Sequence, residues 1–124
     1  MIYKSFTEMP VWQNARNLSA GIFKISMNLP KSEDYGLTSQ IRRSSNGVSA
    51  CIAEGFGRFH YLDKAKFYLN ARGSLFELKS HLLIASDLKF IDQGIAENLI
   101  SDIDRLGVKI NNFITTTRAK AVKQ

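Results

Sequence analysis

The sequence predicts an all-α fold, an antiparallel up-down-up-down four-helix bundle. Apolar residues recur at intervals of three and four in four segments, which is the spacing of one face of a helix. No segment shows the apolar-polar alternation of a half-buried strand. With only two prolines in 124 residues, long helices are permitted. Amphipathic helices joined by short loops pack as antiparallel neighbours, so residues 1–117 are expected to form one bundle.

The first helix is predicted over residues 11–28. Its apolar residues are spaced by four and three, and Trp12, Ser19 and Phe23 widen the stripe that they form. The stripe consists of Val11, Ala15, Leu18, Ile22, Ile25 and Leu29. Pro30 ends the helix, because the residue before a proline is biased away from the helical conformation.

The second helix is predicted over residues 35–54. Its apolar face consists of Leu37, Ile41, Val48 and Ile52. The middle of this segment, SSNGVSACIA, is built almost entirely from small residues. A glycine inside a helix costs about 1 kcal/mol relative to alanine. We therefore expect the small residues around Gly47 to permit the close approach of a neighbouring helix.

The third helix is predicted over residues 62–88, and it carries more apolar residues than one buried stripe needs. These residues include Leu62, Ala65, Leu69, Leu75, Phe76, Leu82 and Leu83. A helix that is apolar over so much of its surface is expected to contact something beyond its own bundle.

The fourth helix is predicted over residues 93–115, with Asp92 as its N-cap. Its stripe consists of Ile95, Leu99, Ile103, Leu106, Ile110 and Phe113. The segment after Thr117, RAKAVKQ, has three basic residues and no acid. A basic, disordered tail is predicted over residues 118–124.

The composition is that of a soluble cytoplasmic protein. Apolar residues make up 44% of the chain, and the single cysteine, Cys51, suits a reducing compartment. No run approaches the ~20 apolar residues of a membrane span, and no secretory signal opens the sequence, so no membrane partner is expected. Seventeen lysines and arginines against eleven acids give a formal charge of +6, which favours contact with a polyanion.

Enzymatic chemistry finds little support in the residues. The stretch GFGRFH lacks the third glycine of a dinucleotide fingerprint and follows a helix, so Gly55 is predicted to adopt the left-handed conformation at a helix end. A metal centre in a bundle needs several inward carboxylates and histidines, and Glu77 with His81 supplies half a site. Cys51 lies among apolar residues and resembles an inert core thiol. No catalytic residue, metal or cofactor is predicted.

Basic and aromatic side chains point instead to nucleic acid, since bases stack on rings and phosphates take the positive charge. The predicted contact residues are Arg42, Arg43, Arg58, Phe59, His60, Lys64, Lys66, Arg118 and Lys120. Two structural alternatives to nucleic-acid contact stay open. In the first, Phe59 and Tyr61 anchor the loop to the core. In the second, the arginines are structural partners of Glu54 and Glu77.

Three motifs also resemble a known family. VWQNARNL (residues 11–18), YGLTSQIRRSSNGVSACIAEGFGR (35–58) and ARGSLFELKSHLLIASDL (71–88) resemble the bacterial four-helix-bundle proteins encoded in intervening sequences of 23S ribosomal RNA genes. The resemblance covers about residues 6–88, and the fourth helix matches only in pattern. The chain departs from the family pattern at Ser44, Ser45, Gly47, Ser49 and Cys51.

The resemblance implies a toroidal homopentamer. It also implies a relationship to the accessory variability protein of diversity-generating retroelements, which binds nucleic acid and a reverse transcriptase through a basic surface. Family features with an implied structural role map to Trp12, Tyr35, Gln40, Glu54, Gly55, Gly73 and Glu77.

Two functions are therefore compared. The first is a non-enzymatic, oligomeric bundle that binds RNA or DNA through a basic surface. The second is a protein-interaction scaffold, a ring with no direct role in nucleic-acid binding, whose partner would be another protein.

Overall fold

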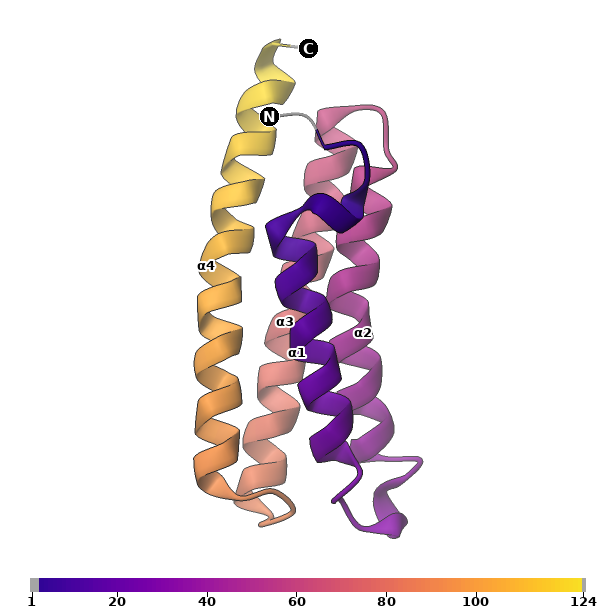
Figure 1. Ribbon diagram of the computed structural model, residues 1–124, viewed down its shortest axis with the longest axis vertical. Coiled ribbons are helices and arrows are strands. Elements are labelled where there is room, and N and C mark those ends of the chain that lie inside the picture. Colours follow the sequence, from indigo (N-terminus) through magenta and orange to yellow (C-terminus); the bar gives the residue numbers. More distant parts are fainter. Residues whose placement is uncertain (1–2, 124) are drawn as a thin grey trace.

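Four long α-helices and two short 3-10 turns make up the computed structural model, which describes residues 3–123 (Figure 1). The helices are α1 (Pro10–Ser26), α2 (Leu37–Phe56), α3 (Tyr61–Asp87) and α4 (Gln93–Lys123), and the turns are η1 (Phe6–Glu8) and η2 (Lys31–Glu33). No strand occurs among the residues described. The predicted fold class is confirmed.

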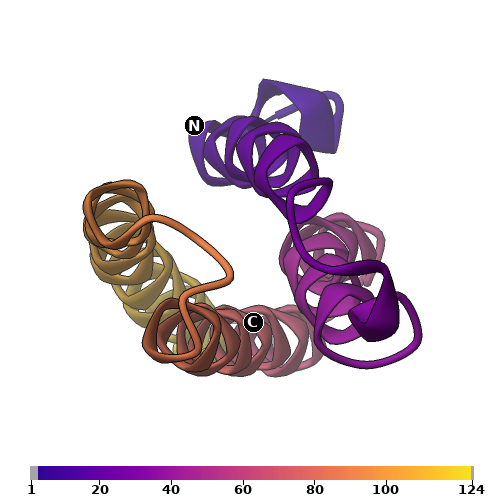
Figure 2. The same ribbon diagram turned by 90° about the horizontal axis from the view of Figure 1, so that it is seen from below.

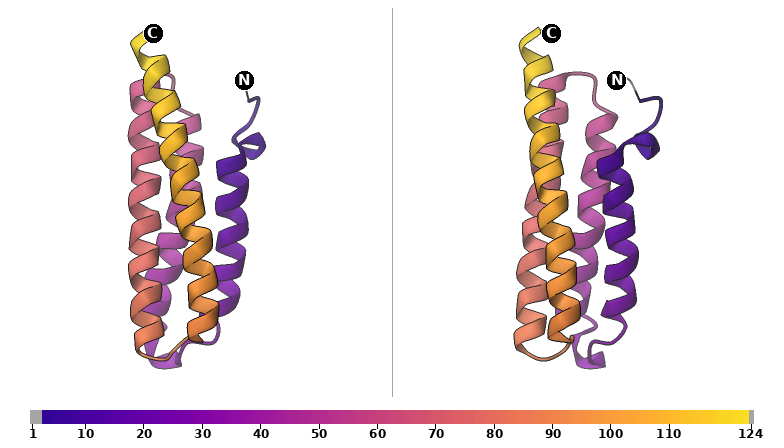
Figure 3. Two further views of the ribbon diagram at one scale, coloured as in Figure 1. Left: turned by 90° about the vertical axis from the view of Figure 1, so that its left-hand side faces the viewer. Right: turned by 60° about the vertical axis from the view of Figure 1, so that its left-hand side comes forward.

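The helices follow one another around the bundle in chain order (Figure 2). α2 and α3 share the most extensive contact, α4 packs on α3, and α1 packs on α2. The contact between α1 and α4 is the smallest of the four. One end of the bundle holds the N-terminal segment, the α2–α3 loop and the end of α4 (Figures 1 and 3). The α1–α2 and α3–α4 loops lie at the other end.

The core consists of the predicted stripes. In α1 and α2 the buried side chains include Val11, Ala15, Leu18, Ile22, Ile41, Val48 and Ile52. In α3 and α4 they include Ala65, Tyr68, Leu75, Leu78, Leu82, Leu99, Ile103, Leu106 and Ile110. Three apolar residues of the α3 pattern are not part of this core, because Leu62, Phe76 and Leu83 are exposed.

The short loop between α3 and α4 has clear local causes. The backbone N–H of Phe90 donates to the carbonyl of Ala85 at 2.9 Å, with Lys89 at φ 63° closing a Schellman-type end. The N–H of Ile95 then donates to Asp92 Oδ2 at 3.1 Å, which confirms Asp92 as the cap of α4.

The tail predicted as disordered is helical. α4 continues from residue 115 to Lys123, and Gln124 lies outside the described residues. The helix persists because its buried stripe continues through Ile114 and Thr117, which pack at 2% and 5% exposure. The prediction was wrong because the first turn of the basic segment was assessed by its charge alone.

The two glycines at the end of α2 also differ from expectation. Gly55 is helical rather than left-handed, and no described glycine has a positive φ. The helix runs to Phe56, and Gly57 is its C-cap with φ −74°. Gly55 serves packing instead, because a Cβ at this position would lie 2.5 Å from Cε1 of Tyr68.

Close approach of α2 and α3 is confirmed at the small-residue segment. A Cβ at Gly47 would lie 2.8 Å from the Ser74 hydroxyl oxygen, so only glycine fits without a shift. On the α1 side, the hydroxyl of Ser19 lies 3.0 Å from that of Ser45, which is buried. Small side chains therefore let α2 sit between its two neighbours.

Candidate nucleic-acid interface

The end of the bundle that holds the α2–α3 loop and the end of α4, whose place Figure 1 shows, carries an excess of basic residues. We define this basic end as residues 3–9, 54–66 and 116–123, which contain seven lysines and arginines against three acids. The cations are Lys4, Arg58, Lys64, Lys66, Arg118, Lys120 and Lys123. The acids are Glu8, Glu54 and Asp63.

The opposite end has the reverse balance. Residues 24–37 and 84–97 contain three lysines against five acids, and we call this region the acidic end. Its lysines are Lys24, Lys31 and Lys89. Its acids are Glu33, Asp34, Asp87, Asp92 and Glu97. A polyanion that approaches the protein is therefore attracted to one end of the bundle and repelled from the other.

The α2–α3 loop presents three of the predicted contact residues to solvent. Phe59 is 81% exposed, and its ring lies edge-on to that of His60 at 5.0 Å. The Phe59 ring therefore does not anchor the loop to the core. The Arg58 guanidinium lies over the ring of Phe67, 4.5 Å from its centroid, so its position is held by α3.

Lys64 and Lys120 lie on neighbouring helices at this end. The Lys64 ammonium donates to the carbonyl of Phe56 at 2.7 Å, which satisfies one of the last carbonyls of α2. Lys120 lies 5.8 Å from the centroid of the Tyr61 ring. Burial and the positive charge of Lys120 lower the pKa of Lys64.

Lys66 and Arg118 are exposed and take part in no hydrogen bond, ion pair or ring contact within the described part of the chain. Their charges are available to a partner. Seven of the nine predicted contact residues thus lie together at the basic end.

Arg42 does not belong to this surface. It starts from the half of α2 near the acidic end, and its Nε donates to the Ser26 hydroxyl at 2.7 Å. Its guanidinium also lies over the Phe23 ring at 5.3 Å. Arg42 therefore ties α2 to α1, a structural role through Ser26 and Phe23 rather than through the expected Glu54 or Glu77.

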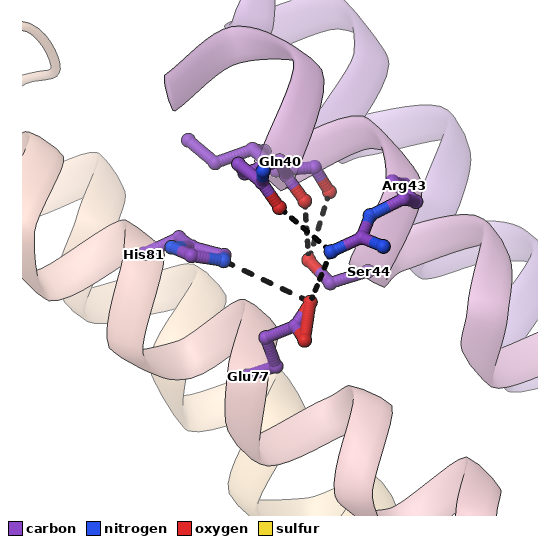
Figure 4. Close-up of polar contacts among 6 residues, drawn as sticks. Gln40, Arg43, Ser44, Glu77 and His81 are labelled. Atoms are coloured by element: carbon purple, nitrogen blue, oxygen red, sulfur yellow. Dashed lines mark hydrogen bonds and ion pairs between the residues drawn. The ribbon is translucent and has the colours of Figure 1, made fainter. Parts of the chain in front are cut away.

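Arg43 is engaged on the other side of α2 (Figure 4). It donates to Gln40 Oε1 at 2.8 Å and lies 3.7 Å from the carboxylate of Glu77 on α3. His81 Nε2 lies 3.8 Å from the same carboxylate and is buried without a hydrogen bond in the described chain. The expected pairing of Glu77 with an arginine is present, whereas Glu54 forms no ion pair among the described residues.

The other residues with an implied structural role divide into two groups. Trp12 packs against the core, with its ring edge-on to Phe6 at 5.0 Å. Tyr35 is fully exposed, and a Cβ at Gly73 would meet nothing within 4 Å. The bundle of a single chain therefore gives no packing reason for Tyr35 or for the glycine at position 73.

Gly73 belongs to an outward face of α3 that carries apolar residues at every second turn. Leu62, Leu69, Phe76 and Leu83 recur at intervals of seven, the spacing that keeps side chains in one seam. Leu62 is 70% exposed and Phe76 is 61% exposed, whereas Leu69 is half-buried. The expectation of an apolar surface in excess of the bundle's own need is confirmed for α3.

The described residues contain no group of three or more histidine, cysteine or acidic side chains that could hold a metal ion. Burial, with a smaller effect of the Glu54 charge, raises the pKa of the Cys51 thiol, which keeps the sulfur protonated at neutral pH. Over residues 3–123, no helix has the length and apolar character to cross a membrane.

Sequence reasoning missed Lys4 as a member of the basic end, and it named Lys123 only as part of the basic tail. Lys123 was assigned to a disordered tail, and Lys4 lies far from the other cations along the chain. The buried stripe from Ile110 through Ile114 to Thr117 was the signal that α4 continues and carries the basic segment to this end.

Comparisons with known proteins agree with this architecture. The family model of the 23S rRNA-intervening sequence protein matches residues 7–112. No curated protein matches the sequence. A crystal structure of a protein of unknown function from the S23 ribosomal protein family of Bacteroides thetaiotaomicron is similar, with a TM-score of 0.75 and 18% identity. The match covers 84% of this chain and 97% of that one, and at this identity it shows the fold alone.

Proposed function

This chain belongs to the family of 23S rRNA-intervening sequence proteins, and we propose that it is a non-enzymatic, oligomeric protein of the cytoplasm that binds RNA or DNA through its basic end. One observation carries the proposal. Seven cations and three acids gather at one end, while three cations and five acids gather at the other. This separation of charge favours the approach of a polyanion to the basic end over the acidic end.

The chemistry of the basic end suits a phosphate backbone with unstacked bases. Lys66 and Arg118 have no partner within the described chain, so phosphates would meet them without breaking ion pairs. The exposed ring of Phe59 offers a stacking surface beside the charges. The contact of Arg58 with the Phe67 ring holds the start of the loop against α3, which lowers the conformational entropy lost on binding.

The outward face of α3 supports oligomer formation. A soluble monomer gains nothing from leucine and phenylalanine side chains repeated every seven residues on a solvated helix. Gly73 lies in the same seam and would allow the helix of a second copy to approach closely. We propose that this face packs against another copy of the chain.

A homopentamer is the ring size that the family resemblance implies, and it stays part of this proposal. Symmetry would repeat the basic end around the ring, and each added copy multiplies the charge that a long nucleic acid meets. Proteins that neutralise many phosphates bind with a steep dependence on salt. The relationship to the retroelement accessory proteins is a proposal of the same kind.

Two triple variants test the basic end against an equal loss of charge elsewhere. In the first, Lys66, Arg118 and Lys123 become glutamine, and in the second Lys24, Lys31 and Lys89 do. All six side chains are exposed. Fluorescence anisotropy with labelled structured RNA, single strand and duplex DNA should show a loss of at least about tenfold for the first variant and little change for the second. Equal losses would contradict a defined binding end.

The alternative of a protein scaffold makes a different prediction for the same material. If the partner is a protein, one protein should be captured selectively after nuclease treatment, and the wild-type chain should bind none of the three nucleic acids at low salt. Capture that disappears on nuclease treatment would instead support the nucleic-acid proposal.

A further inference from the structure

A pocket of about 250 Å³ opens at the basic end, between the N-terminal segment, the end of α2, the start of α3 and the end of α4. Its volume is below the roughly 300–1,000 Å³ of sites that hold a drug-sized ligand. The pocket therefore suits one ring system rather than a dinucleotide. It is separate from the exposed Phe59 ring, which does not line it.

Aromatic rings from three helices line this pocket. Phe56 comes from the end of α2, Tyr61 and Tyr68 from the first two turns of α3, and Phe113 from α4. Tyr68 and Phe113 meet edge to face with ring centroids 4.8 Å apart. Aromatic walls of this kind are the usual platform for a base that has left its stack.

Two ammonium groups belong to the same pocket, and no acid lines it. Lys64 donates to the carbonyl of Phe56 at 2.7 Å and to that of Gly55 at 3.5 Å, which leaves one of its three donors for a ligand. Lys120 makes no hydrogen bond within residues 3–123. The two charges repel one another, and burial weakens the hydration of Lys64, as the lowered pKa of its ammonium reflects. An anion bound between them would relieve this repulsion.

A polar group also lies at the inner end of the pocket. Tyr68 is only 3% exposed, and its hydroxyl forms no hydrogen bond within the described chain. The hydroxyl oxygen is not one of the buried polar atoms without a partner, so it remains open to the pocket, where a ligand with a polar edge can bond it. The pocket thus combines rings, positive charge and one hydrogen-bonding group.

We propose that this pocket takes one unstacked base of a single-stranded nucleic acid. The rings of Phe56 and Phe113 enclose the base, the Tyr68 hydroxyl bonds its polar edge, and Lys64 and Lys120 hold the adjacent phosphate. This inference rests on the proposed function, because it names how the basic end distinguishes a single strand from a duplex, whose bases are stacked and unavailable.

The test compares two strands with the same phosphates. One is a labelled strand of five deoxyadenosines, and the other is a strand of the same length in which every nucleotide is abasic. Stacking and hydrogen bonding of one base should make the wild-type protein bind the first strand at least about fivefold more tightly. Equal affinity would overturn the pocket inference and leave the proposed function intact. Failure to bind either strand would overturn both.

Substitutions then connect the preference to the pocket. Tyr68→Phe removes only the hydroxyl, and it should weaken binding of the deoxyadenosine strand about three- to tenfold while leaving the abasic strand unchanged. Thr117→Met adds a flexible side chain at a buried lining position and should abolish the preference. Tyr35→Phe, the same change at an exposed tyrosine near the acidic end, is the matched control and should change neither strand.

A free nucleotide carries the same base and phosphate groups and is therefore the other ligand that the pocket could bind. Adenosine monophosphate added as a competitor should displace the labelled strand only weakly, because it lacks the neighbouring phosphates. Competition as strong as that of the unlabelled strand would overturn the assignment to a strand.

The two pocket variants give a further check. If both Tyr68→Phe and Thr117→Met keep the full preference for the deoxyadenosine strand, base recognition lies elsewhere and the inference is overturned.

Discussion

Gly55 and Tyr68 approach so closely that a single added carbon does not fit between them. A Cβ on Gly55 would lie 2.5 Å from Cε1 and 2.9 Å from Cδ1 of the tyrosine ring. The ring is held on its other side by Phe113. This contact positions α3 against the end of α2 and thereby sets the geometry of the basic end.

Gly55→Ala is therefore expected to destabilise the protein by about 1–3 kcal/mol, the usual cost of overpacking. Alanine has the higher helix propensity by about 1 kcal/mol, but a rigid, packed ring has no room to move, so the clash dominates. Urea unfolding followed by circular dichroism measures the change. A stability equal to or above that of the wild type would contradict the packing account.

Gly73→Ala is the matched change at a glycine with no steric neighbour in the single chain. Its free energy of unfolding per protomer should rise by up to about 1 kcal/mol, because alanine is the better helix former. Its oligomer should weaken if the α3 seam is an interface, since the added carbon keeps the second helix at a distance. An oligomer of unchanged strength would remove Gly73 from the interface.

Arg42→Ala should reduce stability without changing nucleic-acid affinity. The substitution removes a hydrogen bond to Ser26 and a contact with the Phe23 ring, together worth about 1–2 kcal/mol. Thermal unfolding and anisotropy on the same preparation separate the two effects. A variant that keeps its melting temperature and loses affinity would return Arg42 to the binding surface.

Tyr68 should titrate at an unusually high pH. Burial raises its pKa to about 12. The folded protein holds this proton more tightly than the unfolded chain does. The contribution of Tyr68 to the free energy of unfolding is therefore fully present below about pH 10, and it is lost as the pH rises through about 12. Absorbance at 295 nm should show a late ionisation step that Tyr68→Phe removes. A late step that survives the substitution would belong to another residue.

If the proposed oligomer forms through α3, Phe76→Ser should dissociate it while each protomer stays folded. Phe76 is exposed in the single chain, so its loss removes little from the core. Val108→Ser on α4 is the matched control, because both side chains are 61% exposed. Sedimentation velocity should show a smaller species for the first variant only. Dissociation by both or by neither would contradict the assignment of the interface to α3.

The helices and the core were predictable because helical periodicity depends on residues near one another in the chain. The stripes through Ile22, Val48 and Ile103 were identified on this basis. The role of Gly55 was not, because the pattern Gly-Phe-Gly looks the same whether a glycine ends a helix or receives a ring from the next one. The distinction depends on Tyr68, which lies across the interface between α2 and α3.

The candidate site was predictable in part for the same reason. Arg58, Phe59 and Lys64 are close in sequence and were grouped together. Arg42 joined them only by residue type, and the structure separates it by most of the length of α2. Of the two α4 residues that line the pocket, Phe113 lies within the predicted helix, whereas Lys120 reaches this end because α4 continues beyond its predicted end.

The salt dependence of affinity tests the central claim most directly. The dissociation constant of the wild-type protein for structured RNA and for duplex DNA would be measured between 50 and 200 mM salt. If the basic end contacts phosphates, the logarithm of affinity for duplex falls linearly with the logarithm of salt, by about 0.9 per phosphate contacted. The proposal predicts at least three such contacts per protomer. A flat salt dependence, or no binding at the lowest salt, would contradict it.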